Sequence, residues 1–198
     1  LALIAFACLS GVYLSIHSTV QLQANLSALG ERRSITPTHK LSMILGDLLV
    51  LESIHFVNIL ILELYLTQVL HISLGHDIPK LLLITFMGTL IGICLGILIG
   101  CAGKLSYSVK SGIGVLVTLF PSFLAGLMFG DMKNLIEQHC PVINRINPAS
   151  VLSDAFYCLS VYDDAVRYRR CILILVIMCL LCISFSFFMI RRERYDSI

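Results

Sequence analysis

Five polar side chains interrupt a long apolar segment in the first third of the chain. They are Asp47, Glu52, His55, Asn58 and Glu63. At about 100° per residue they fall within about 160° of a helix circumference, and Glu52 and His55 are i, i+3 neighbours. Such groups can end at the cytoplasmic interface, bridge to other helices, or line a path for a substrate or for protons. The spacing alone leaves these three interpretations open.

Sequence signatures of catalysis are absent. The stretch GILIGCAGKLS, residues 96–106, is close to a phosphate-binding loop, but that motif requires Gly at position 98 and Ser or Thr at position 105. The chain has Leu98 and Leu105 there. It also has no H-E-x-x-H pair, no metal-spaced cluster of Cys and His, and no serine nucleophile elbow. We therefore expect no enzyme, no catalytic residue, no metal site and no ATP site on this chain.

The segments that carry these residues are too apolar for a soluble domain. Of the 198 residues, 58% are hydrophobic and 13% are charged, whereas about a quarter of a soluble domain is charged. A helix needs about 20 apolar residues to cross the hydrocarbon of a bilayer. Five segments are candidates: 1–20, 45–70, 81–103, 111–130 and 171–190. We expect one all-α integral membrane domain over residues 1–198, with about five transmembrane helices and short interfacial helices.

Basic residues between the spans indicate the orientation. A cytoplasmic C-terminus places eight of them inside: Arg32, Arg33, Lys40, Lys104, Lys110, Arg191, Arg192 and Arg194. It places six outside: Lys80, Lys133, Arg145, Arg167, Arg169 and Arg170. Because the inside loops are short, this majority favours a multi-pass protein with a cytoplasmic C-terminus. The net charge of +2 is too small to indicate nucleic-acid binding, so the bilayer is the expected partner.

Residues 131–170 form the one long polar connection, which this orientation places outside. Asn147 and Pro148 read as an N-cap and a first helical position. The apolar residues that follow repeat at helical spacing, which predicts a short amphipathic helix at the interface or packed on the bundle. Cys140 and Cys158 lie in this segment, and the sequence leaves open whether they pair. The other six cysteines lie in or beside apolar runs, where Cys behaves as a small hydrophobe.

A glycine recurs at every fourth position of the third span, at Gly88, Gly92, Gly96 and Gly100. Each step of four residues turns about 40° around a helix, so the glycines form a shallow, slowly winding groove. Small residues let helix backbones approach closely in lipid. We expect helix packing along this groove, and a surface along which helices slide is the other interpretation.

The stretch LFPSFLAGLMFGD, residues 119–131, places a proline inside an apolar run. In a membrane, neighbouring helices can satisfy the carbonyl that a proline leaves free. We expect Pro121 to kink the fourth span well inside its length, Gly126 to allow close packing beyond the kink, and Asp131 to emerge on the outer face.

Together these parts resemble the permease of a type-2 ABC exporter, over essentially the whole chain. The most telling region runs from residue 121 to residue 159, where PSFLAGLMFG is followed by an outer segment and by RINPASVLSDAFYCL. The family has a proline with small residues in this span, then an "n-x-x-P" region and a short helix containing Asp and Ala. The matching residues are Pro121, Gly126, Asn147, Pro148, Asp154 and Ala155. Family permeases have six spans, so an N-terminal part with the first span is expected to be missing here.

The resemblance implies a function and its partners. The loop GERRSITP looks like the family's coupling region, where Glu31, Arg32 and Arg33 would receive force from an ABC ATPase instead of serving only as charged anchors. A second permease half, identical or different, would complete the transporter, and ATP and Mg²⁺ would bind the separate or fused ATPase. The expected cargo is an unidentified drug, peptide, lipid, polysaccharide or ion that crosses the cytoplasmic membrane.

Residue roles follow from the same resemblance. An outer gate or kink is assigned to Pro121, Gly126, Asn147, Pro148 and Asp154. The alternative function is a stand-alone ion- or proton-coupled carrier that uses Glu52, His55 and Glu63.

Overall fold

A computed structural model describes residues 1–22, 40–75, 77–103, 105–162 and 164–192. Within these ranges the secondary structure is helical and contains no strand. Five stretches of the described residues are long and apolar enough to cross a membrane: Ala2–Gln21, Ile44–Gln68, Ile78–Gly100, Tyr107–Leu124 and Ala165–Met189. The prediction of an all-α membrane bundle with about five transmembrane helices is therefore confirmed.

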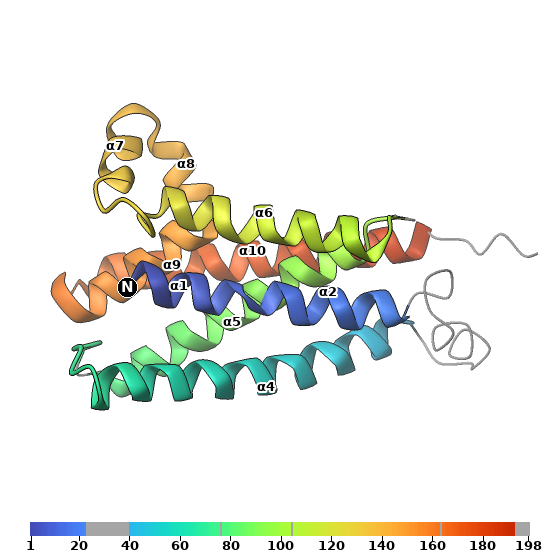
Figure 1. The fold of residues 1–198 in the computed structure, drawn as a ribbon, viewed down its shortest axis with the longest axis horizontal. Coiled ribbons are helices and arrows are strands. Elements are labelled where there is room, and N and C mark those ends of the chain that lie inside the picture. Colours follow the sequence, from blue (N-terminus) through green and yellow to red (C-terminus); the bar gives the residue numbers. More distant parts are fainter. Residues whose placement is uncertain (23–39, 76, 104, 163, 193–198) are drawn as a thin grey trace, which may run out of the picture.

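The long helices pack as an up-and-down bundle around α5 (Figure 1). Their bounds are α1 Ala2–Leu9, α2 Gly11–Leu22, α4 Lys40–Gln68, α5 Ile78–Gly100, α6 Tyr107–Leu124 and α10 Ala165–Arg192. Helix α5 contacts each of the others. Figure 1 shows two ends of the bundle. One end, here called the α2–α4 end, carries the end of α2, the start of α4 and the end of α10. The opposite end, here called the α9 end, carries the start of α5 and the short helices.

The glycines of α5 lie where other helices come closest. A Cβ added at Gly92 would lie 2.6 Å from the Cys8 carbonyl oxygen, and one at Gly100 would lie 2.6 Å from Thr19 Cβ. At Gly88 the nearest atoms belong to Leu152, 2.9 Å away. Because a side chain would not fit, α1, α2 and α9 pack directly on the α5 backbone, and van der Waals contact at that distance stabilises a bundle in lipid.

Helix α6 ends at Leu124, although its apolar composition continues to residue 130. Gly126 adopts the left-handed backbone conformation, with φ at 93°, and the N–H groups of Gly126 and Leu127 bond back to carbonyls of the last turn. This arrangement is the Schellman motif, in which glycine is favoured because it lacks a Cβ. Contrary to what the sequence led us to expect, Pro121 therefore does not lie well inside the helix. Pro121 lies in the last turn of α6, and Gly126 terminates the helix.

Two other helices begin earlier than their apolar runs do. Helix α5 begins at Ile78, since Pro79 fits the first helical turn. Helix α10 begins at Ala165, because Asp164 Oδ1 accepts hydrogen bonds from the N–H groups of Val166 and Arg167. The arginines expected in the last outer loop thus lie on the first turns of α10.

The polar connection after α6 folds into three short helices and one π-helical turn. They are α7 Met132–His139, α8 Pro141–Ile146, α9 Pro148–Tyr157 and the turn Cys158–Tyr162. Helix α9 packs against α1, α5, α6 and α10, with Leu152 and Phe156 fully buried. The short helix predicted from the apolar repeat is thus packed on the bundle. Cys140 is exposed, Cys158 is buried, and both thiols are free.

Candidate functional site

Three of the polar residues on α4 face the interior of the bundle. Glu52, His55 and Glu63 are each only 4% exposed, and we call them the polar seam. Large apolar side chains of the same helix, such as Leu49 and Ile61, point outward and are more than 60% exposed. The polar side of this helix thus faces the bundle and its apolar side faces outward, the reverse of a surface helix in a soluble protein. Ionisable groups in a membrane protein are expected to face the bundle interior in this way.

The two carboxyls of the polar seam bind threonines of α5. Glu52 Oε1 and Thr89 Oγ1 are 2.6 Å apart, and Glu63 Oε1 and Thr85 Oγ1 are 2.5 Å apart. Both threonine hydroxyls are themselves fully buried. The second oxygen of Glu52, Oε2, is buried without a hydrogen-bond partner. The seam therefore joins α4 to α5 through two short polar contacts.

His55 joins α4 to the first span. Its Nε2 lies 2.9 Å from the carbonyl oxygen of Cys8, and because a carbonyl only accepts hydrogen bonds, Nε2 carries a hydrogen. The imidazole fits because position 11 is glycine: a Cβ on Gly11 would lie 2.7 Å from His55 Cδ2. His55 thus sits where α1 gives way to α2.

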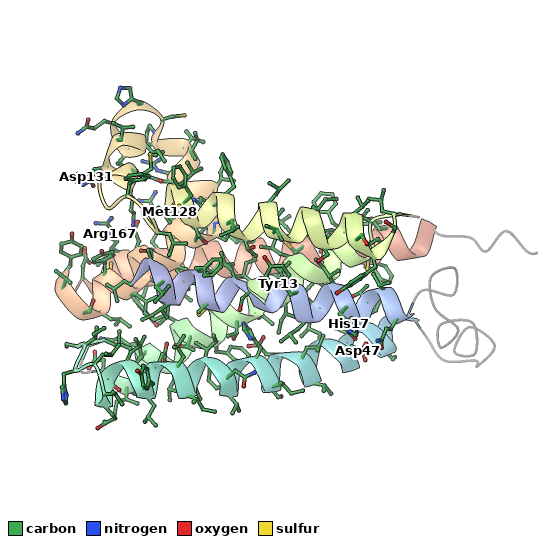
Figure 2. All side chains as sticks on the ribbon, in the orientation of Figure 1. Tyr13, His17, Asp47, Met128, Asp131 and Arg167 are labelled. Carbon is green, nitrogen blue, oxygen red and sulfur yellow. The ribbon has the colours of Figure 1, made fainter. Side chains whose placement is uncertain are left out.

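The remaining two polar residues of α4 do not belong to the seam. Asn58 is exposed on the outer side of the helix. Asp47 lies near the α2–α4 end, close to His17 in Figure 2, and its Oδ2 accepts a hydrogen bond from Ser18 at 2.8 Å. The five residues therefore do not form one functional surface, because the 160° arc of their helical wheel is wider than a single contact face.

Asn147 connects α9 to the end of α6. Its Oδ1 accepts hydrogen bonds from the N–H groups of Ala149 at 2.9 Å and Ser150 at 3.3 Å, which caps α9 as predicted from the Asn–Pro sequence. Its Nδ2 donates to the carbonyl oxygen of Pro121 at 2.8 Å. Pro148 takes the first helical position of α9. Two residues assigned to the outer gate, Pro121 and Asn147, are therefore in direct contact.

Asp154, a third residue assigned to the outer gate, binds two cations. Its carboxylate accepts a hydrogen bond from Lys133 of α7, and Arg167 Nη2 of α10 lies 3.4 Å away. Lys133 also lies over the Tyr157 ring, 5.6 Å from its centroid. Figure 2 shows Arg167 beside the short helices at the α9 end, near the exposed Asp131. Asp154 thus fastens α7, α9 and α10 to one another.

Sequence reasoning missed the partners of these groups. Thr85 and Thr89 sit four residues apart in an apolar span, and that spacing is the signal that could have marked them as partners for acids on a neighbouring helix. Lys110 was counted in a cytoplasmic loop, but it lies on α6, is fully buried, and donates to the Gly100 carbonyl oxygen at 2.6 Å. It binds the end of α5, where free carbonyls favour a cation.

Two expectations concern other parts of the molecule. The coupling residues Glu31, Arg32 and Arg33 lie outside the residues that the structure describes. In the ranges given above, no three His, Cys, Asp or Glu side chains are grouped so that they could hold a metal ion.

Comparison with known proteins identifies the family. The model of the ABC-2 family transporter protein matches residues 1–188. No curated protein and no solved structure matches the chain significantly. The family match confirms the resemblance seen in the sequence and implies an ABC ATPase as a partner in general terms. Together with five apolar spans, it shows that the chain belongs to the ABC-2 transporter family and is a membrane subunit of an ABC transporter.

Proposed function

We propose that this subunit forms half of the export path of an ATP-driven transporter in the cytoplasmic membrane. A second half, identical or different, completes the path, and the C-terminus faces the cytoplasm. ATP and Mg²⁺ bind a separate or fused ATPase, and the cargo is an unidentified drug, peptide, lipid, polysaccharide or ion. The chain itself performs no catalysis.

The observation that carries this proposal is the position of α9. This helix is buried between α1, α5, α6 and α10, so it occludes one end of the bundle. Side-chain bonds hold it in place: Asn147 bonds to the end of α6, and Asp154 binds Lys133 and Arg167. Because these bonds join separate helices, they can break together when the helices move, as an outer gate requires.

The coupling residues are assigned to the connection between α2 and α4. The end of α2 and the start of α4 lie at the opposite end of the bundle from α9 (Figure 1). Helix α2 lies directly on the α5 backbone at Gly96 and Gly100, so a displacement of α2 is passed to α5. An ATPase bound at Glu31, Arg32 and Arg33 can open the gate only if it binds the open and closed bundles with different free energies.

Labelling of Cys158 tests the proposal without knowledge of the cargo. The full-length protein is purified with its associated ATPase, placed in lipid, and treated with a maleimide. ATP bound to a hydrolysis-deficient ATPase should raise the labelling rate of buried Cys158 several-fold, while exposed Cys140 serves as the internal control. The double variant Glu31→Lys/Arg32→Glu should abolish this rise. Absence of an ATPase from the purified protein, or labelling that ignores ATP, contradicts the proposal.

The polar seam favours a second candidate, the stand-alone carrier, because three ionisable groups of α4 are buried inside the bundle. That function predicts transport driven by an ion gradient with no ATPase present, and loss of transport in Glu52→Gln or Glu63→Gln. Membership in the ABC-2 family supports the first candidate. Gradient-driven flux through the purified subunit alone would decide for the second.

A further inference from the structure

The hydroxyls of Thr85 and Thr89 have more acceptors within reach than hydrogens to donate. Thr89 Oγ1 lies 2.6 Å from Glu52 Oε1 and 3.0 Å from the Thr85 carbonyl oxygen. Thr85 Oγ1 lies 2.5 Å from Glu63 Oε1 and 2.9 Å from the Leu81 carbonyl oxygen. Each hydroxyl has a single hydrogen. If that hydrogen goes to the carbonyl one turn back, a usual bond for a helical threonine, each glutamate must supply the hydrogen of its own contact.

The second oxygen of Glu52 points to the same protonation state. Oε2 is buried and has no hydrogen-bond partner. In an ionised carboxylate this oxygen would share the negative charge, and an uncompensated buried charge is among the most unfavourable groups in a protein. In a protonated carboxyl that donates through Oε1, Oε2 is a neutral carbonyl oxygen, which costs far less to leave unpaired.

Among the residues that the structure describes, no ion pair is shown for either carboxyl. The ion pairs of Asp77 with Lys80, and of Asp154 with Lys133 and Arg167, include neither glutamate.

The helices packed against α4 face the carboxyls with neutral groups. These are the Cys8 thiol from α1 and the Cys94 thiol from α5. From α4 itself comes His55, whose Nε2 hydrogen binds the Cys8 carbonyl. From α2, Ser18 binds Asp47 near the α2–α4 end.

The two carboxyls also converge. Glu52 and Glu63 are eleven residues apart, which is about 16 Å along a helix, whereas Thr85 and Thr89 are one turn, about 6 Å, apart. Both side chains therefore lean toward the same turn of α5. Burial of each carboxyl in this low-dielectric contact disfavours its charged form, which again favours protonated carboxyls.

We propose that Glu52 and Glu63 form a paired proton-binding site that closes the contact between α4 and α5. Both carboxyls are protonated at neutral pH, and each donates a hydrogen bond to its threonine. When α4 moves away from α5, the carboxyls lose the threonines, meet water and release their protons. Proton release and uptake then accompany any transport step that separates these helices, whether or not an ATPase drives it.

Infrared spectroscopy of the full-length protein in lipid at neutral pH tests the site directly. A carboxylic acid has a carbonyl stretching band that a carboxylate lacks. We expect Glu52→Gln and Glu63→Gln each to remove one carboxylic acid band and no carboxylate band. Thr89→Val should shift the Glu52 band to higher frequency without moving the Glu63 band, and Thr85→Val should do the converse. The valine variants provide the test even if a glutamine variant fails to fold.

Glu137 provides the matched control. It is exposed on α7, so Glu137→Gln should remove carboxylate bands only. Loss of carboxylate bands in both seam variants would overturn the proposal. It would also be overturned if exchanging Na⁺ for another alkali cation shifted the Glu52 or Glu63 bands, since a metal ion would then occupy the site in place of protons.

Discussion

Gly96 marks the closest approach of α5 and α2, and a single added methyl group there tests how the bundle is held together. A Cβ at this position would lie 1.9 Å from Ser15 Oγ, 2.4 Å from the Val12 carbonyl oxygen and 2.8 Å from Val12 Cα. The serine hydroxyl can rotate away, but the two Val12 atoms belong to the backbone. Gly96→Ala therefore forces the two helices apart.

The size of the effect follows from two opposing contributions. Overpacking a well-packed contact costs about 1–3 kcal/mol, and a backbone obstacle places Gly96→Ala near the upper limit. Alanine favours the helix over glycine by about 1 kcal/mol. The net loss in the free energy of unfolding is therefore about 2 kcal/mol, or about 30-fold in the folding equilibrium.

Reversible unfolding of the full-length protein in mixed lipid–detergent micelles, followed by circular dichroism, measures this loss. Gly112→Ala in α6 is the matched control, because nothing lies within 4 Å of a Cβ there, and it should leave stability unchanged or slightly higher. Adding Ser15→Ala to Gly96→Ala should recover less than half of the loss, since the Val12 carbonyl remains in place. Full recovery, or a Gly96→Ala protein as stable as the control, would refute the backbone contact.

Three further predictions concern the α9 end. Asn147→Asp should lower the free energy of unfolding by about 1–3 kcal/mol. Aspartate caps a helix equally well, but its carboxylate would face the Pro121 carbonyl oxygen that Asn147 now binds. Unchanged thermal stability would contradict the bridge between Asn147 and Pro121. Asp154→Asn should cost about 1 kcal/mol and speed hydrogen exchange in α7 and α9, whereas unchanged exchange would show that the ion pairs do not fasten them. Burial raises the pKa of the Cys158 thiol, so a maleimide at neutral pH should label Cys140 and spare Cys158 in the resting protein, and equal rates would contradict the buried position.

The apolar runs predicted the five spans but not where the helices end. Hydropathy reports which residues tolerate lipid, and residues 125–130 do. The helix nevertheless stops at Leu124, because Gly126 adopts the left-handed conformation and the following N–H groups bond back to the last turn. Hydropathy does not report on backbone conformation or on these hydrogen bonds. At α10 the helix is longer than its apolar run. The charged residues before that run suggested a loop, but Asp164 caps a helix that already includes them.

The site was predictable in kind and not in its pairings. Ionisable groups inside an apolar run usually face the interior of a bundle, and Glu52, His55 and Glu63 are buried there, whereas Asp47 binds Ser18 near the α2–α4 end. Which residues of α5 the buried groups meet depends on the axial offset between α4 and α5, and the sequence of α4 alone does not determine that offset. The helical angle of Asn58 groups it with the buried residues, yet an amide is uncharged and Asn58 is exposed on the outer side of the helix.

The packing glycines and the polar seam meet at the Cys8 carbonyl oxygen. Gly92 has no side chain, which lets this oxygen lie against α5, and Gly11 has none, which lets the His55 ring reach it. A larger residue at either position would separate α1 from its neighbours and move His55, which sits one turn from Glu52. The spacing of the helices therefore determines whether Glu52 and Glu63 keep their bonds to the threonines and stay out of contact with water. A force that separates the helices at the α5 glycines also opens the polar seam.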